Sequence, residues 1–218
     1  TGELSLGELQ DMLQSDFAGQ ESFRRRIDSE LPKYGNADAT ADALAVEWAE
    51  FLSDTTESNT VGLHRYVPGF FCWIIHEKFG SEKGATPDGR PAGFPRADGA
   101  GAAQGKELNG PTASILSTTK WNHQRALGGL VHNLKLSDNL IDHEAGLQAL
   151  RALIETYMQR GGFEIQVNVV NADELRDAQA HPDQYQDLLV RVAGYSDYFV
   201  HLNANMQEEV IKRTEHTL

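Results

Sequence analysis

Residues 163–170, with the sequence Phe-Glu-Ile-Gln-Val-Asn-Val-Val, carry the clearest structural period in the 218-residue chain. Apolar and polar side chains alternate along them, as in a β-strand that has one apolar face. Gln166 and Asn168 would share the other face of that strand. Gly161-Gly162, directly before the strand, are expected to end a helix that begins near Asp142.

The segment after this strand predicts another helix and another strand. The helix is expected over residues 172–186, with a break at Pro182, and the strand over residues 188–192. A last helix is expected from Asn205, whose side chain would cap its N-terminus.

The N-terminal half of the chain is less regular. Ser5 and Glu8 form a capping-box pattern in a region, residues 5–30, that predicts two short helices. The other expectations for this half are a helix over residues 40–51, a buried strand over residues 61–75 interrupted at Pro68-Gly69, a long glycine- and proline-rich loop over residues 80–111, a strand over residues 114–118 and regular structure over residues 127–136. Loops as long as the one expected here are usually functional or disordered.

Composition and charge favour an ordinary soluble protein. Apolar residues make up 40% and charged residues 23% of the chain, which is usual for a globular domain. The formal net charge of −13 argues against nucleic acid and anionic membranes as partners. No apolar run reaches the roughly 20 residues needed to cross a bilayer. Since the N-terminus also lacks a signal-peptide pattern, we expect a cytoplasmic protein.

Most familiar site motifs are absent from the sequence. It has no His-Glu-x-x-His, no cysteine pair for zinc, no phosphate-binding loop with Gly-Lys-Ser/Thr and no Gly-x-Ser-x-Gly elbow. The histidines are scattered, so we expect no metal site. The single cysteine, Cys72, excludes an internal disulfide and suits a reducing compartment. Its apolar neighbours in residues 70–75 predict a buried thiol with a raised pKa and a structural role.

One segment remains, Arg191-Val192-Ala193-Gly194-Tyr195-Ser196. Taken alone, it predicts a strand followed by a turn in which Gly194 adopts a positive φ. With the residues that follow it, up to Phe199, this segment resembles the radical-site signature of the glycyl radical enzymes.

Further stretches match that family in the expected order. They are Pro32-Lys33-Tyr34-Gly35-Asn36, Ala85-Thr86-Pro87-Asp88-Gly89-Arg90 with Ala92-Gly93, Asn109-Gly110-Pro111-Thr112-Ala113, Gly161-Gly162 with Gln166-Val167-Asn168-Val169-Val170, Leu175-Arg176-Asp177-Ala178-Gln179 with His181-Pro182, and Arg213-Thr214-Glu215-His216. The resemblance covers nearly the whole chain. It is nearer to the branch of dehydratases, C–X lyases, decarboxylases and arylsuccinate synthases than to pyruvate formate-lyase itself.

The resemblance implies that Gly194 carries a radical on its α-carbon. Such a radical is stabilised by delocalisation into the flanking amides, which needs a planar centre that a β-carbon would crowd. Arg191, Val192, Ala193, Tyr195 and Ser196 would hold the loop around it. Apolar neighbours are suited to keep water and oxygen away, namely Leu188, Leu189, Val190, Val192 and Phe199.

The resemblance also implies an α/β fold, the C-terminal part of a ten-stranded α/β barrel together with the loop domain of the glycyl radical. Residues 1–97 would belong to the barrel domain and residues 98–218 to the glycine radical domain. Gln166 and Asn168 are candidates to line the barrel interior, and structural hydrogen bonding is an equal alternative for both.

In this family the radical passes to a cysteine at the tip of a barrel loop, and the resulting thiyl abstracts hydrogen from a small-molecule substrate. Cys72 has none of the context of that cysteine, so the thiyl is expected on a larger chain or on a missing part of the same protein. No cofactor is expected to stay bound. A radical S-adenosylmethionine activating enzyme would install the radical, and the assembled enzyme would be a dimer.

Two alternatives remain open. The chain could be a non-catalytic radical-domain partner that restores a damaged glycyl radical enzyme, or an inert structural remnant. The matches within residues 1–80 favour a split enzyme or a fragment over the first alternative, and the intact Gly194 segment argues against the second.

Overall fold

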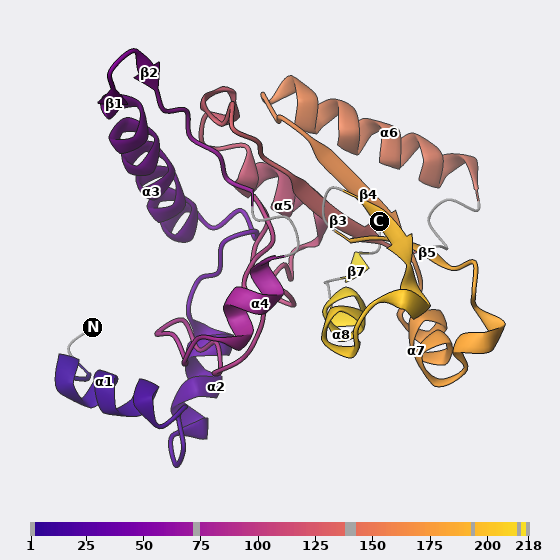
Figure 1. The fold of residues 1–218 in the computed structure, drawn as a ribbon, viewed down its shortest axis with the longest axis horizontal. Coiled ribbons are helices and arrows are strands. Elements are labelled where there is room, and N and C mark those ends of the chain that lie inside the picture. Colours follow the sequence, from indigo (N-terminus) through magenta and orange to yellow (C-terminus); the bar gives the residue numbers. More distant parts are fainter. Residues whose placement is uncertain (1–2, 72–74, 138–142, 193–194, 213–214, 217–218) are drawn as a thin grey trace. The chain divides into compact units, whose positions relative to one another are not determined.

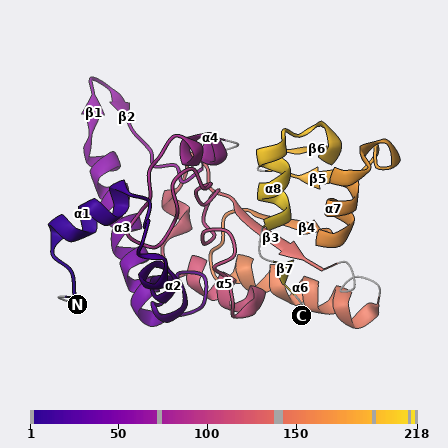
Figure 2. The same ribbon diagram turned by 90° about the horizontal axis from the view of Figure 1, so that it is seen from below.

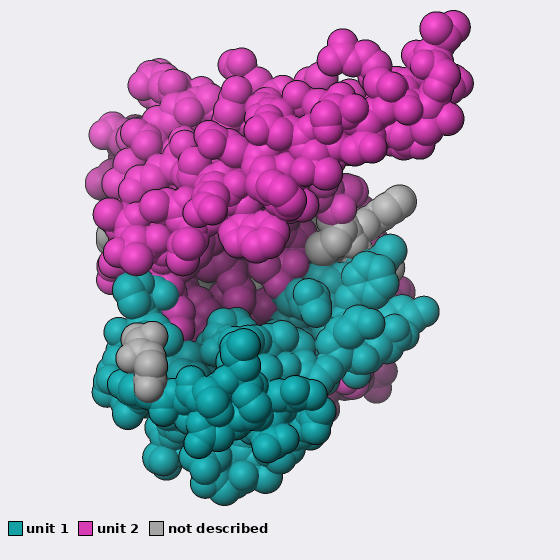
Figure 3. All heavy atoms as spheres, turned by 90° about the vertical axis from the view of Figure 1, so that its left-hand side faces the viewer, with its two compact units in different colours: residues 1–32, 75–96 teal, residues 33–74, 97–218 magenta. Residues whose placement is uncertain are grey.

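The computed structural model describes residues 3–71, 75–137, 143–192, 195–212 and 215–216. The chain divides into two compact units, residues 1–32 with 75–96 and residues 33–74 with 97–218 (Figure 3). Cys72, Ala193 and Gly194 lie outside the described residues. The expected core role of Cys72 therefore stays a prediction.

The smaller unit is built from α1 (Leu6–Gln14), α2 (Glu21–Glu30) and α4 (Ile75–Ser81). The predicted capping box starts α1, because Ser5 Oγ accepts a hydrogen bond from Glu8 N–H (3.2 Å) and Glu8 Oε2 accepts one from Ser5 N–H (2.8 Å). The apolar core of the unit is formed by Met12, Phe17 and Ile27.

The predicted loop over residues 80–111 is confirmed for most of its length, since residues 82–109 contain no helix or strand. Arg90 organises the part in the smaller unit. Its guanidinium donates hydrogen bonds to the carbonyl oxygens of Gly84 and Phe94, and its own carbonyl accepts one from Thr86 N–H (3.0 Å). The Ala85–Arg90 motif is therefore a loop fastened by its last side chain.

The larger unit holds most of the regular structure (Figure 1). Its helices are α3 (Ala39–Ser58), α5 (Gly110–Thr118), α6 (Glu144–Gln159), α7 (Ala172–Ala180) and α8 (Ala204–Lys212), with short 3₁₀ turns at His123–Arg125, Pro182–Gln184 and Phe199–His201. Its strands are β1 (Thr60–Val61), β2 (His64–Arg65), β3 (His132–Leu136), β4 (Ile165–Val169), β5 (Leu189–Arg191), β6 (Ser196–Tyr198) and β7 (Glu215–His216).

A parallel sheet of three strands in the order β4-β3-β7 forms the centre of this unit. Ile115 of α5, Leu134 of β3 and Tyr157 of α6 form an apolar cluster on one face of the sheet, and Figures 1 and 2 show α6 running alongside β3 and β4. The opposite face is polar, and α8 and the β5–β6 hairpin contact it through Lys135 and Asn168. A sheet with one apolar and one polar buried face thus positions the hairpin.

Several predicted elements are confirmed. The helix predicted over residues 40–51 is α3, which is longer than predicted, and the helix predicted from about Asp142 is α6. The strand predicted over 163–170 is β4, and the strand predicted over 188–192 is β5. The helix with a break at Pro182 is α7 followed by its 3₁₀ turn. Gly161, with φ of 88°, follows α6 as expected for a helix-ending glycine. The strand within residues 127–136 is β3.

The strand expected over residues 114–118 is wrong, since this segment is the C-terminal part of α5. Pro111 stands in the first turn of the helix, where its missing N–H costs nothing. Most of α5 is buried, including Ser114, Ser117 and Thr118, so no one-sided helical period marks it in the sequence.

The buried strand expected over residues 61–75 is also wrong. Where the structure describes it, over residues 61–71 and at Ile75, the segment gives only the exposed antiparallel pair of β1 and β2, an isolated bridge from Phe70 to Leu130 and the start of α4. Pro68 has no N–H for a ladder, and Gly69 packs so closely on Gly128 that a β-carbon there would lie 3.1 Å from its backbone.

The N-cap expected at Asn205 is wrong by two residues. Asn203 caps α8, because its Oδ1 accepts a hydrogen bond from Met206 N–H (2.9 Å), whereas Asn205 lies inside the helix. The sequence Asn203-Ala204-Asn205 contains two residues of the type that caps helices. The preceding 3₁₀ turn ends at His201 and α8 begins at Ala204, so the first of them, Asn203, is the N-cap.

Candidate functional site

The hairpin of β5 and β6 flanks the predicted radical residue. Its strands pair antiparallel, with Arg191 opposite Ser196. Val192 N–H donates to the Tyr195 carbonyl (2.9 Å), so the described residues on either side of Ala193 and Gly194 are joined to each other. The structure therefore defines the two ends of the predicted radical loop, at Val192 and Tyr195. Ala193 and Gly194, between these ends, do not belong to the described residues.

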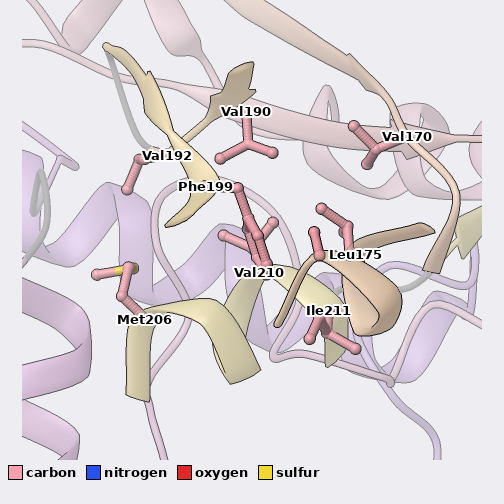
Figure 4. Packing of buried hydrophobic residues seen from close by; sticks show 9 residues of the cluster. Val170, Leu175, Val190, Val192, Phe199, Met206, Val210 and Ile211 are labelled. Atoms are coloured by element: carbon pink, nitrogen blue, oxygen red, sulfur yellow. The ribbon is translucent and has the colours of Figure 1, made fainter. Parts of the chain in front are cut away.

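The apolar side of the hairpin is buried in a cluster with α7 and α8. Val190, Val192 and Phe199 are each at most 2% exposed, and Figure 4 shows them gathered with Leu175 of α7 and Val210 of α8. Val170, Ala178, Met206 and Ile211 complete the cluster. Water is thereby excluded from the side of the hairpin on which these side chains lie.

Two of the five apolar neighbours expected around Gly194, Leu188 and Leu189, are less buried than the other three. Leu188 is half-buried and packs against the cluster, and Leu189 is 55% exposed. Leu189 alternates with the buried Val190 along β5, so it points to the opposite side. Tyr195 also packs on the cluster, and burial, followed by the negative charge of Asp197, raises the pKa of its hydroxyl.

The polar side of the hairpin faces β4. Asn168 Oδ1 accepts from Arg191 N–H (2.8 Å), and Asn168 Nδ2 donates to the Arg191 carbonyl (2.8 Å). Gln166 Oε1 accepts from Arg191 Nε (3.0 Å), and Arg191 Nη1 donates to Ser196 Oγ (3.3 Å). The structure thus brings three of the sequence-predicted residues, Gln166, Asn168 and Ser196, together around a fourth, Arg191.

Gln166 and Asn168 are 6% and 5% exposed, so the polar face of β4 is the better buried one. The apolar residues that alternate with them, Ile165, Val167 and Val169, are only half-buried. Whether the face of Gln166 and Asn168 lines a barrel in the complete protein stays a prediction.

Sequence reasoning missed the polar residues of β3. Asn133 and Lys135 lie in register with Gln166 and Asn168. Lys135 Nζ donates to the Ile211 carbonyl near the end of α8 (3.3 Å), where the helix dipole favours a cation. The alternation His-Asn-Leu-Lys-Leu over residues 132–136 was the available signal for this face.

A small polar cavity adjoins this face. Its volume of about 30 Å³ suffices for one or two water molecules. Side chains from several elements line it, namely Asp98, Gln104, Glu107, Asn133, Lys135 and Glu209. Glu209 of α8 and Lys135 of β3 are almost fully buried.

Two other predicted motifs meet away from the hairpin. Asn36 Oδ1 accepts from the N–H groups of Leu108 (2.6 Å) and Asn109 (3.0 Å), and its Nδ2 donates to the Lys106 carbonyl (2.7 Å). The Pro32–Asn36 motif therefore holds the entry to α5. Within the same region Ser114 Oγ donates to Glu107 Oε1 (2.7 Å) and lies 3.3 Å from His132 Nε2.

Among the residues that the structure describes, no group of three or more His, Cys, Asp or Glu side chains is arranged to hold a metal ion. Within the same residues, no helix is long and apolar enough to span a membrane.

Comparison with known proteins places this arrangement in a family. Residues 96–200 match the family model described as glycine radical, and residues 1–80 match the model described as pyruvate formate lyase-like. The probable dehydratase YbiW of Escherichia coli is 38% identical over 227 residues, which cover 100% of this chain and 28% of YbiW. Isethionate sulfite-lyase of Desulfovibrio desulfuricans is 38% identical over 226 residues, covering 98% of this chain and 26% of that enzyme.

A solved structure shares the fold. The glycerol-bound, B12-independent glycerol dehydratase of Clostridium butyricum superposes with a TM-score of 0.94 at 37% identity, over 99% of this chain and 28% of that one. The chain thus spans about a quarter of the length of the relatives it matches, and its fold is the α/β fold of that part. It belongs to the glycyl radical enzyme family and corresponds to the C-terminal portion of its members.

Proposed function

We propose that Gly194 carries a stored organic radical and that this chain forms the radical-bearing part of a glycyl radical lyase. The observation that carries the proposal is the match of residues 96–200 to the glycine radical family, because this range includes the Arg191–Ser196 signature. Relatives named as a dehydratase and a sulfite-lyase support a lyase or dehydratase reaction. A decarboxylase reaction, which belongs to the same branch, stays a further candidate.

The surroundings of the hairpin suit this chemistry. An α-carbon radical needs a glycine, since a β-carbon would crowd the planar centre, and it needs protection from water and oxygen. Val192, two residues before Gly194, is fully buried, and Val190 and Phe199 are buried with it. Arg191, Val192, Ala193, Tyr195 and Ser196 hold the loop in this proposal, and Arg191 has the hydrogen bonds to do so.

The radical at Gly194 would not act on substrate directly. It would take a hydrogen atom from a cysteine thiol in the remainder of the protein or on a larger partner chain, and the thiyl so formed would abstract hydrogen from a small-molecule substrate. In this proposal residues 1–97 complete a ten-stranded α/β barrel and residues 98–218 form the glycine radical domain. The ranges matched by the two family models, 1–80 and 96–200, support that division.

Installation of the radical needs a partner. A radical S-adenosylmethionine enzyme with an iron–sulfur cluster would remove a hydrogen atom from the α-carbon of Gly194, so that this chain itself retains no bound cofactor. We place the assembled enzyme, as a dimer, in the cytoplasm.

The alternative function is a non-catalytic radical domain that docks onto a damaged enzyme and replaces its lost C-terminus. The match of residues 1–80 to the pyruvate formate lyase-like family favours the lyase, because a replacement module would not need that region.

Electron paramagnetic resonance tests the proposal. The complete protein, activated under anaerobic conditions, should give an organic-radical doublet from the single hydrogen left on Gly194. Gly194→Ala should abolish the signal, while Gly105→Ala, in an open position on an exposed loop, should keep it. A doublet that survives Gly194→Ala would remove Gly194 from its proposed role.

A further inference from the structure

We infer that Asn168 is a positioning residue whose side-chain amide fixes the Gly194 hairpin on the parallel sheet. The inference rests on the proposed function for its consequence in catalysis. The docking geometry itself is independent of that function.

Arg191 occupies a special position in the hairpin. The ladder hydrogen bonds run from Val192 N–H to Tyr195 and from Phe199 N–H to Leu188. In an antiparallel pair such positions alternate with positions whose main-chain groups point outward. Arg191, between them and opposite Ser196, therefore presents its N–H and carbonyl to the outer edge of β5, towards β4.

The amide of Asn168 satisfies both of these groups. It accepts from Arg191 N–H and donates to the Arg191 carbonyl, each at 2.8 Å. One side chain thus replaces a neighbouring strand at a single point of the hairpin edge. That point lies only three residues before Gly194 in sequence, and Asn168 is 95% buried, with 5% of its surface exposed.

The apolar contacts of the hairpin do not define its position in the same way. Val190 and Val192 pack in a cluster with side chains of α7 and α8, and burial of apolar surface is not directional. Hydrogen bonds have narrow limits of distance and angle. The register of the hairpin along β4 therefore depends on Asn168, with support from Gln166, whose Oε1 accepts from Arg191 Nε (3.0 Å).

The bonds from the Asn168 side chain reach only the main chain of Arg191. Substitutions of Asn168 therefore test the main-chain docking of the hairpin and leave the side chain of Arg191 unchanged. Asn168→Ala removes both bonds. Asn168→Asp keeps the size and the acceptor for Arg191 N–H, but it replaces the donor with an oxygen that faces the Arg191 carbonyl. Asn122→Ala is the matched control, because Asn122 is exposed and its Oδ1 accepts one local bond from Gln124 N–H (3.0 Å).

The test uses the complete, activated protein and two readouts. The first is hydrogen exchange of Arg191 N–H, with Val170 N–H, which bonds to the Leu136 carbonyl, as the reference in the sheet. Asn168→Ala should speed exchange at Arg191 about tenfold relative to that reference, because its acceptor is gone. The second readout is turnover divided by the number of radicals counted by electron paramagnetic resonance.

Asn168→Ala and Asn168→Asp should each lower turnover per radical by about tenfold or more, because small displacements of a reacting centre are costly. Asn122→Ala should leave it unchanged. Turnover per radical that equals the control in both variants would overturn the positioning role, and so would unchanged exchange at Arg191. If Asn168→Ala does not fold, the isosteric Asn168→Asp decides. A parent protein without any radical would refute the proposed function, while the exchange comparison would still decide the docking.

Discussion

Asn36 and Asn109, 73 residues apart, are joined by two hydrogen bonds in which Asn109 is the donor both times: Asn109 N–H donates to Asn36 Oδ1 (3.0 Å), and Asn109 Nδ2 donates to the Asn36 carbonyl (3.1 Å). They belong to two motifs of the family resemblance, Pro32–Asn36 and Asn109–Ala113. The contact closes the long loop at its junction with α5. We call this pair of Asn36–Asn109 bonds the clasp. Ser114 of α5 contacts His132 at the start of β3, so the clasp supports, through α5, the sheet on which the hairpin docks.

Asn36→Ala should therefore destabilise the complete protein. It removes the acceptor of Leu108 N–H and the donor to the Lys106 carbonyl, besides the bond from Asn109 N–H. Because these groups are only partly buried, we expect a loss of about 2 kcal/mol, measured by chemical denaturation. Asn122→Ala, which removes one exposed bond, should cost clearly less, and equal losses would contradict the clasp.

Gly35 gives a second test of the same contact. Its φ is +91°, and a β-carbon would lie 2.9 Å from both Ala102 Cβ and Glu107 Cγ. Gly105 has a φ of +74° with nothing within 4 Å, so alanine there meets only the backbone strain. Gly105→Ala should cost about 1 kcal/mol, and Gly35→Ala about 1 to 3 kcal/mol more through overpacking. Similar unfolding free energies for the two variants would show that the loop is not held tightly on Gly35.

His123 predicts an acid-sensitive loss of stability. It is 1% exposed, beside Trp121 and Tyr157, and burial lowers its pKa below the ordinary 6.5, against the opposing bond to the Thr118 carbonyl. The unfolded chain therefore takes up the proton first as the pH falls, so this contribution to stability is present above pH 6.5 and is lost below it. Between about pH 7.5 and about pH 5.5 the melting temperature of the parent should fall more than that of His123→Gln. His64→Gln, at an exposed position on β2, should follow the parent, and identical slopes for the parent and His123→Gln would contradict the prediction.

The outer face of α3 predicts how the isolated chain behaves. Leu44, Trp48, Phe51 and Leu52 are 44% to 61% exposed and recur at the spacing of one helix face, while the buried positions of α3 are Asp42, Ala49 and Ser53. An apolar stripe of this kind is normally covered, so the isolated chain should self-associate in light scattering. Trp48→Gln with Phe51→Gln should reduce that association and destabilise the complete protein. A monodisperse isolated chain with a sharp cooperative melt would contradict this and would favour the stand-alone radical domain.

The elements and residues that the sequence predicted are those whose signal is local. A capping box, a helix-ending glycine and the alternation of β4 each lie within a few residues of the structure that they specify. The partner of Gln166 and Asn168 was not predictable in this way, because Arg191 is 23 to 25 residues further along the chain. The alternation along β4 therefore predicts that the strand has one apolar and one polar face. Only the tertiary structure shows that the polar face is the better buried one.

The wrong predictions have the same physical origin. Helix α5 is buried on most sides, so its sequence lacks the period that a half-exposed helix would show. In residues 61–71 apolar and β-branched side chains imitate a buried strand, but Val61 is 62% exposed and Leu63 fully exposed. The apolar composition of a segment alone does not indicate whether another part of the chain packs over its side chains.

Oxygen offers a test of the radical site to a single residue. A carbon-centred backbone radical adds dioxygen rapidly, and the peroxyl species that forms decays with scission of the chain at that residue. Activated protein exposed to air should therefore break at Gly194, and intact mass spectrometry should find a piece that ends at about residue 193 and a C-terminal piece that retains α8. Protein that is not activated, protein kept anaerobic and the Gly194→Ala variant should all stay whole. A protease-sensitive loop would be cut with or without activation, so the four samples separate the two causes. If activated, air-exposed protein stays whole or breaks elsewhere, Gly194 is only a turn residue between β5 and β6.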